Sequence, residues 1–251
     1  LPYLAVLGAL VISLILGVVC QAAKPAVSYA KPGIALISNK FLRAGIILLG
    51  FKLNLVALAQ AGVKTIALAC VVVTGTIFLA YNLARRFGVD GHLAILTASG
   101  TGICGAAAVM GIASQLPASE KDAERHGEDK VVAVAIVAIL GTLFTLVDIA
   151  VGPLLGMSAT QFGVMAGGSL HEIAHAVAAG GAGGSESLDI AIITKLSRVL
   201  LLAPAAIVIG VWYRKAEGVE ADGKGKVPIP WFMVGFVAAS VVGTIAPLTQ
   251  E

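Results

Sequence analysis

The sequence predicts an all-α polytopic membrane protein, and three observations carry that prediction. Hydrophobic residues make up 58% of the 251 residues and charged residues only 12%, whereas soluble domains carry about 25% charged residues. The 30 glycines suit close helix packing in lipid and do not suit a transmembrane barrel, whose strands alternate over about 10 residues. Four uncharged runs exceed the ~18 residues that identify a membrane span, namely Leu1–Ala23, Thr65–Ala84, Leu93–Ser119 and Val227–Gln250.

About eight helices are expected to cross the membrane within one domain, residues 1–251. The uncharged runs, the prolines that interrupt the connections and the charged residues at segment ends place them. In chain order they are Tyr3–Gln21, Ile34–Ala59, Val63–Arg86, Leu93–Leu116, Lys130–Leu155, Thr160–Gly180, Leu188–Tyr213 and Trp231–Ile245. Lys40, Arg43, Lys52 and Asn54 interrupt the otherwise apolar second segment. We expect Asn54 to face the protein interior and Lys40 the membrane interface.

The basic residues predict an orientation if all eight segments span, since cytoplasmic loops are rich in Lys and Arg. One face then receives Lys24, Lys31, Arg85, Arg86, Arg214, Lys215, Lys224 and Lys226. The other receives Lys64, Lys121, Arg125 and Lys130. The richer face is expected to be cytoplasmic, whereas a re-entrant Leu93–Leu116 would move every later loop to the opposite face.

A broken helix is expected near residues 99–105, where three glycines occur within six residues. Each glycine costs a helix about 1 kcal/mol relative to alanine. Non-helical backbone at membrane depth is tolerated only where protein or a watery cavity satisfies it, and such a break marks a transporter binding site. We therefore expect substrate to contact Ser99, Thr101, Gly102 and Cys104.

Two stretches resemble one another within the chain. Gly100–Val109 and Gly167–Val177 are both rich in small residues, and each precedes an apolar helix headed by an acidic residue. Inverted-repeat transporters leave such internal similarity. Chance similarity among Gly/Ala-rich helices explains it equally well.

His171, Glu172 and His175 form an H-E-x-x-H motif within a predicted helix. Such spacing places both imidazoles on one helix face, as in zinc peptidases. A third ligand would be required, with Asp189 and Glu186 as candidates. The favoured alternative is transport, because ionisable groups at bilayer depth cost at least ~2.5–3.5 kcal/mol and mark pathways, and all three motif residues could then carry a coupled proton. A structural cluster that bridges helices is the third interpretation.

Lys195 and Arg198 lie three residues apart on one face of the next predicted helix. Their side chains could snorkel to the membrane surface. Alternatively they line an anion site, to which a helix amino terminus near Gly102 would add free amides and a positive dipole.

Several of these stretches resemble the YeiH-type family of sulfate exporters. Residues 100–108 (GTGICGAAA) are similar to its G-T-x-I-C-G-A-S-A stretch, and residues 166–175 (AGGSLHEIAH) to A-G-x-S-I-H-E-V-A-Q/H. Residues 195–204 (KLSRVLLLAP) resemble K-L-T-R-V-x-L-L-A-P, and residues 48–53 (LLGFKL) and 229–232 (IPWF) also fit. The family often has Gln at the last H-E-x-x-H position, which weakens a zinc role for His175.

The resemblance implies a multi-pass protein of the bacterial inner membrane, with inverted repeats and crossed, broken helices related to sodium/proton antiporters and bile-acid symporters. Family members carry further helices beyond both ends of this sequence, so a homodimer is one expectation for a shorter chain. Taken together, we expect a secondary transporter, not an enzyme, that exports sulfate or an organosulfur anion and is coupled to H⁺ or Na⁺. No nucleic acid, resident metal or cofactor is implied. The alternatives are an intramembrane zinc metallopeptidase and a non-transporting membrane scaffold.

Overall fold

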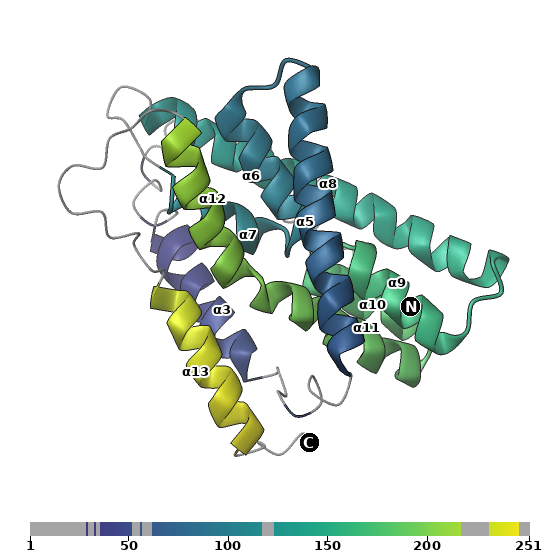
Figure 1. The fold of residues 1–251 in the computed structure, drawn as a ribbon. Coiled ribbons are helices and arrows are strands. Elements are labelled where there is room, and N and C mark those ends of the chain that lie inside the picture. Colours follow the sequence, from purple (N-terminus) through teal and green to yellow (C-terminus); the bar gives the residue numbers. More distant parts are fainter. Residues whose placement is uncertain are drawn as a thin grey trace.

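The computed structural model describes residues 36–51, 62–116, 123–216 and 231–245, together with Tyr29, Gly33 and Val56, and this part of the chain is helical (Figure 1). The predictions for Tyr3–Gln21 and Asn54 fall outside the described residues. In chain order the elements are η1 (Ile37–Phe41), α3 (Leu42–Gly50), α5 (Gly62–Arg86), α6 (Gly91–Gly102), α7 (Ala106–Ala113), α8 (Ala123–Leu154), α9 (Ala159–Ser169), α10 (Ile173–Ala182), α11 (Ser185–Leu200), α12 (Leu202–Ala216) and α13 (Trp231–Ile245).

Three described helical stretches are long and apolar enough to cross a membrane. They are Thr65–Arg86, Glu124–Leu154 and Ser185–Lys215. The predicted helices Val63–Arg86 and Trp231–Ile245 agree closely with α5 and α13. Three other predicted helices are each divided in two: Leu93–Leu116 into α6 and α7, Thr160–Gly180 into α9 and α10, and Leu188–Tyr213 into α11 and α12.

Helices α6 and α7 form a hairpin whose tip is the turn at residues 103–105. Gly105 has φ +71° and ψ −134°, a conformation that essentially only glycine adopts at low cost. A Cβ atom on Gly100 would lie 2.8 Å from Val109 Cγ2, so α7 returns alongside α6. The break predicted near residues 99–105 is therefore confirmed.

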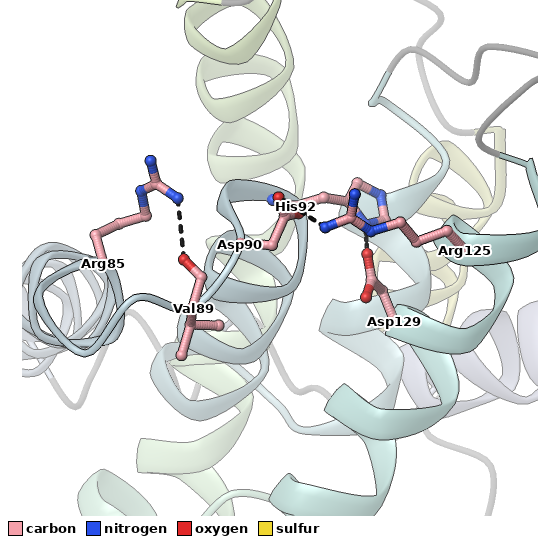
Figure 2. A network of polar contacts seen from close by, with 6 residues as sticks. All are labelled: Arg85, Val89, Asp90, His92, Arg125 and Asp129. Carbon is pink, nitrogen blue, oxygen red and sulfur yellow. Dashed lines mark hydrogen bonds and ion pairs between the residues drawn. The ribbon is translucent and has the colours of Figure 1, made fainter.

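Both ends of this hairpin lie on the same side of the molecule. At its base Asp90 pairs with Arg125 at 3.1 Å and His92 Nδ1 lies 2.7 Å from Asp129 Oδ2, which joins the start of α6 to the start of α8 (Figure 2). At the other leg the Arg214 side chain, at the end of α12, donates to Gln115 O at 3.4 Å.

The single helix predicted over Leu93–Leu116 is therefore wrong, and the chain reversal has the geometry that the re-entrant alternative requires. The physical reason is length, since the 12 residues of α6 rise only about 18 Å and a bilayer core is about 30 Å thick. Arg125 consequently lies on the same face as Arg85 and Arg86 rather than opposite them.

Helices α9 and α10 form a second hairpin, with its tip at residues 170–172. A Cβ atom on Gly183, just after α10, would overlap Phe162 near the start of α9. Thr160 Oγ1 also donates to Glu186 at the start of α11, at 2.8 Å. The prediction of one helix over Thr160–Gly180 is wrong, because the backbone is extended at Leu170 and Glu172. No glycine or proline at residues 170–172 signals this break in the sequence.

The second hairpin enters from the opposite end of α8. A Cβ atom on Gly152 would meet the Phe162 ring at 2.5 Å, which places the end of α8 beside the start of α9. Between Asp129 and Gly152, α8 rises about 35 Å at 1.5 Å per residue. One hairpin thus opens towards each end of this spanning helix, and α11 packs against α5, α9 and α10 between them (Figure 1).

The core gathers around the first hairpin and α11–α12. Ile103, Val109, Ile112, Leu202 and Phe236 are buried in one apolar cluster. At the edge of the molecule α3 packs along α13 (Figure 1).

Candidate functional site

Helix α11 places two buried cations between the hairpin tips. The Lys195 residue is 0% exposed and Arg198 is 1% exposed, so the expectation that they snorkel to the membrane surface is wrong. Lys195 Nζ donates to Ile103 O at 2.9 Å and to Leu170 O at 2.6 Å. Because one of these carbonyls belongs to each tip, a single ammonium group joins the two breaks.

Arg198 binds the carboxyl ends of α6 and α9. Its guanidinium donates to Gly102 O at 2.6 Å and to Thr101 O at 3.1 Å in the first hairpin. It also donates to Gly168 O at 2.6 Å and to Gly167 O at 3.3 Å in the second. The carboxyl ends of helices carry partial negative charge. The Arg198 cation therefore stabilises the carboxyl ends of α6 and α9, which it brings together. Direct binding of an anion by Lys195 and Arg198 stays a prediction.

The amino ends of α7 and α10 lie on the other side of the same junction. Gly105 is the N-cap of α7 and Glu172 the N-cap of α10, and neither N-cap residue bonds the first turn of its own helix through its side chain. The carboxyl group of Glu172 lies beside the backbone N–H of Ala106. A Cβ atom on Gly105 would lie 2.5 Å from Glu172 Cγ, so this position has room only for glycine.

A pocket of about 410 Å³ opens at these amino ends. This volume falls within the ~300–1,000 Å³ of small-molecule sites. The lining comes from both hairpins, from η1 and α3, and from the α11–α12 junction. It consists of Phe41, Gly45, Cys104, Ala106, Ala107, Glu172, Ile173, Ala174, Val199 and Leu202. Glu172 contributes a carboxyl group and Cys104 a thiol to this lining, and the first turns of α7 and α10 contribute Ala106, Ala107, Ile173 and Ala174.

The two histidines lie behind the tip, against α8. His171 and His175 are 5% and 1% exposed, and a Cβ atom on Gly141 would meet His175 Cε1 at 2.5 Å and His171 Cβ at 3.3 Å. Among the described residues neither ring nitrogen of His171 has a hydrogen-bond partner, while His175 Nε2 lies 3.4 Å from Thr142 Oγ1.

The helix-face geometry expected for a zinc motif is wrong. His171 and Glu172 precede α10 rather than lie on it. Of the proposed third ligands, Glu186 hydrogen-bonds Thr160 at the base of the hairpin. Within the described ranges, no three His, Cys, Asp or Glu side chains gather as a metal site.

The structure brings most of the predicted site residues together. Cys104 and Glu172 line the pocket, and Thr101 and Gly102 contribute carbonyls to Arg198. Ser99 instead bonds its own helix, donating to Ile95 O at 2.6 Å.

Sequence reasoning missed the contributions of η1, of α3 and of the α10 amino end to this pocket. The small-residue stretch before His171, which resembles the first break, was the signal for the second tip. No such signal marks Phe41 and Gly45, which reach the pocket only through tertiary packing.

Comparisons with known proteins give a consistent family. The family model described as conserved hypothetical protein 698 matches residues 2–251. A UPF0324 membrane protein of Lactobacillus johnsonii is 54% identical, covering 98% of this chain and 73% of its own length. UPF0324 membrane proteins of Bifidobacterium longum and Bacillus cereus are 52% and 48% identical over all of this chain, and over 73% and 72% of their own lengths. No solved structure matches.

Proposed function

Because the chain belongs to the conserved hypothetical protein 698 family, whose relatives are named as bacterial membrane proteins, we propose that it is a secondary transporter of a small anion. The substrate class is sulfate or an organosulfur anion, and the direction is export across the inner membrane. The observation that carries this proposal is the pocket between two hairpin tips, lined by Glu172 and the amino ends of α7 and α10.

The amino ends of the half-helices support an anionic substrate. Free backbone N–H groups and the positive dipole end favour negative charge. The carbonyl ends of α6 and α9 are already neutralised by Lys195 and Arg198, so the net field in the junction does not oppose an anion. Discontinuous helices around a midplane site are a recurrent design of secondary transporters.

Glu172 supplies a means of coupling. Its carboxylate lies beside the Ala106 N–H, where a bound anion would also be stabilised, so the two negative charges compete. Binding of the anion therefore favours protonated Glu172, with His171 and His175 as neighbouring proton carriers. One sulfate and one proton together carry a net charge of −1, and an inside-negative potential drives that charge outward by about 2.3 kcal/mol per 100 mV.

The two hairpins also support alternating access and an orientation. Their entry from opposite ends of α8 fits an inverted repeat, in which one group of helices rocks against another. Arg85, Arg86, Arg125 and Arg214 lie at one end of the molecule, whereas residues 150–194, which include the second hairpin, contain no Lys or Arg. By the positive-inside rule the basic end faces the cytoplasm.

Sulfate flux in proteoliposomes tests the proposal. Radiolabelled sulfate should cross the membrane of proteoliposomes that contain the purified full-length protein. The net flux should depend on the proton gradient across that membrane. Glu172→Gln should abolish proton-coupled net flux while sulfate–sulfate exchange continues, because a neutral side chain mimics the loaded state. Glu186→Gln, an exposed carboxyl at the base of the same hairpin, is the matched control and should leave both rates unchanged. Undiminished proton-coupled flux in folded Glu172→Gln would contradict the coupling role, and flux that follows Na⁺ but not pH would identify sodium as the coupling ion.

A further inference from the structure

A second hollow lies on the outer surface between α5 and α12. It is an apolar groove of about 390 Å³, floored by Ile95 of α6. Cys70, Ile77 and Tyr81 line the α5 wall, and Val208 and Trp212 of α12, with Leu201 just before that helix, line the other wall. Phe78 and Val208 are 67% and 66% exposed, so the groove faces the surroundings of the protein.

The groove has the length of one membrane leaflet. Tyr81 follows Cys70, and Trp212 follows Leu201, by eleven residues, which corresponds to about 16 Å along a helix. Half of a ~30 Å hydrocarbon core is about 15 Å. The inner end at Leu201 lies next to Leu202 of the central pocket, which places it near the middle of the membrane.

The outer end of the groove has the chemistry of a lipid headgroup site. Tyr81 and Trp212 meet edge to face there, with ring centroids 5.3 Å apart, as aromatic residues do at membrane interfaces. Beyond this aromatic pair, the last turns of α5 and α12 carry four cationic side chains, Arg85, Arg86, Arg214 and Lys215. Arg86 and Lys215 are exposed and form no ion pair with the described residues.

We propose that the α5–α12 groove binds one anionic phospholipid of the leaflet on the basic side. An acyl chain lies along the apolar walls, the glycerol region meets Tyr81 and Trp212, and the phosphate meets the cations. Basic pockets between transmembrane helices bind anionic headgroups in this manner. A packed transmembrane helix fits less well, because it would need an apolar groove across both leaflets and no cluster of cations at its end.

Quenching of Trp212 fluorescence by brominated lipids tests this site. In full-length protein with every other tryptophan replaced by Phe, brominated phosphatidylglycerol should quench Trp212 at lower mole fraction than brominated phosphatidylcholine. Each exposed cation near the membrane contributes about fivefold in affinity for anionic lipid. Arg86→Gln with Lys215→Gln should therefore remove most of the preference for phosphatidylglycerol. Arg125→Gln removes a charge from the same face, but one already paired with Asp90, and should leave the preference unchanged.

A second variant tests the position of the acyl chain. Ala205→Phe places a ring inside the groove and should reduce quenching by both lipids at unchanged thermal stability. Equal quenching by both lipids that ignores the Arg86 and Lys215 changes would overturn the proposal. So would a Trp212 that neither lipid quenches, because another segment of the longer protein or a second copy would then cover the groove.

Discussion

Replacement of Arg198 by Met tests whether the two hairpins depend on a buried cation. Of the last four carbonyls of α6, Ser99 O accepts the Ile103 N–H and Gly100 O accepts the Gly105 N–H. The remaining two, Thr101 O and Gly102 O, accept from Arg198. In α9 the same side chain serves Gly167 O and Gly168 O.

Arg198→Met would thus remove the described donor from four carbonyls, of which Gly102 O and Gly167 O are buried and Thr101 O and Gly168 O are part-buried. Leu170 O keeps its bond to Lys195 and is not counted. A buried polar group left without a partner costs about 1–3 kcal/mol, so the two buried carbonyls alone account for a loss of about 2–6 kcal/mol. Relief of the buried charge offsets part of that loss. Because the free energy of unfolding of a protein is only about 5–15 kcal/mol, the Arg198→Met variant should be markedly less stable than the wild type.

Lys195→Met provides the internal comparison. It removes the described donor from Ile103 O alone, since Leu170 O retains Arg198, and should cost about 1–3 kcal/mol. Thermal stability of the two variants in detergent, followed by fluorescence-detected gel filtration, should rank them below the wild type with Arg198→Met lowest. An Arg198→Met protein as stable as the wild type would refute the reasoning.

Three further predictions follow from the geometry. In the variants Arg125→Cys and Glu186→Cys, an impermeant thiol reagent should label the new cysteines from opposite sides of the membrane. Labelling of both from one side would contradict the re-entrant hairpins. Gly105→Ala should cost about 1–3 kcal/mol of backbone strain and displace Glu172, so sulfate flux should fall in protein that remains folded, and wild-type flux would refute this. Burial lowers the pKa of His92 at the hairpin base, outside the long spans, so the folded state favours the neutral ring. Its stabilising contribution is present above about pH 6.5 and is lost as the pH falls towards the lower folded pKa; His92→Gln should flatten this acid-side loss of thermal stability.

The first break could be predicted from sequence because its cause is local. Glycines at 100, 102 and 105 weaken a helix wherever it packs, and Gly105 indeed adopts a positive φ. The second break had no such marker at its turn, where Leu170, His171 and Glu172 are ordinary residues for a helix. Its extended backbone is supported by tertiary contacts, such as the bond from Lys195 to Leu170 O.

The burial of Lys195 and Arg198 is likewise a long-range property. Their partners in the first hairpin lie more than 90 residues away in sequence, so charge patterning alone suggested a surface position equally well. The membrane crossings of α6–α7 and α9–α10 were misassigned because hydropathy measures apolar length and not chain reversal. Each hairpin returns the chain to the face from which it entered, so the second hairpin restores the order of faces that the first one changed. Arg214 therefore lies on the predicted face although Arg125 does not.

The shared anchoring of both tips on α11 has a mechanical consequence. Lys195 and Arg198 bind the tips of both hairpins to α11. We therefore expect the two tips and α11 to move together as one rigid body. The opposite wall of the pocket, Phe41 and Gly45, belongs instead to the η1–α3 segment, whose helical partner is α13 (Figure 1). For the transport cycle proposed above, we therefore expect the moving boundary to lie between that helix pair and the anchored tips, with the substrate bound at this boundary.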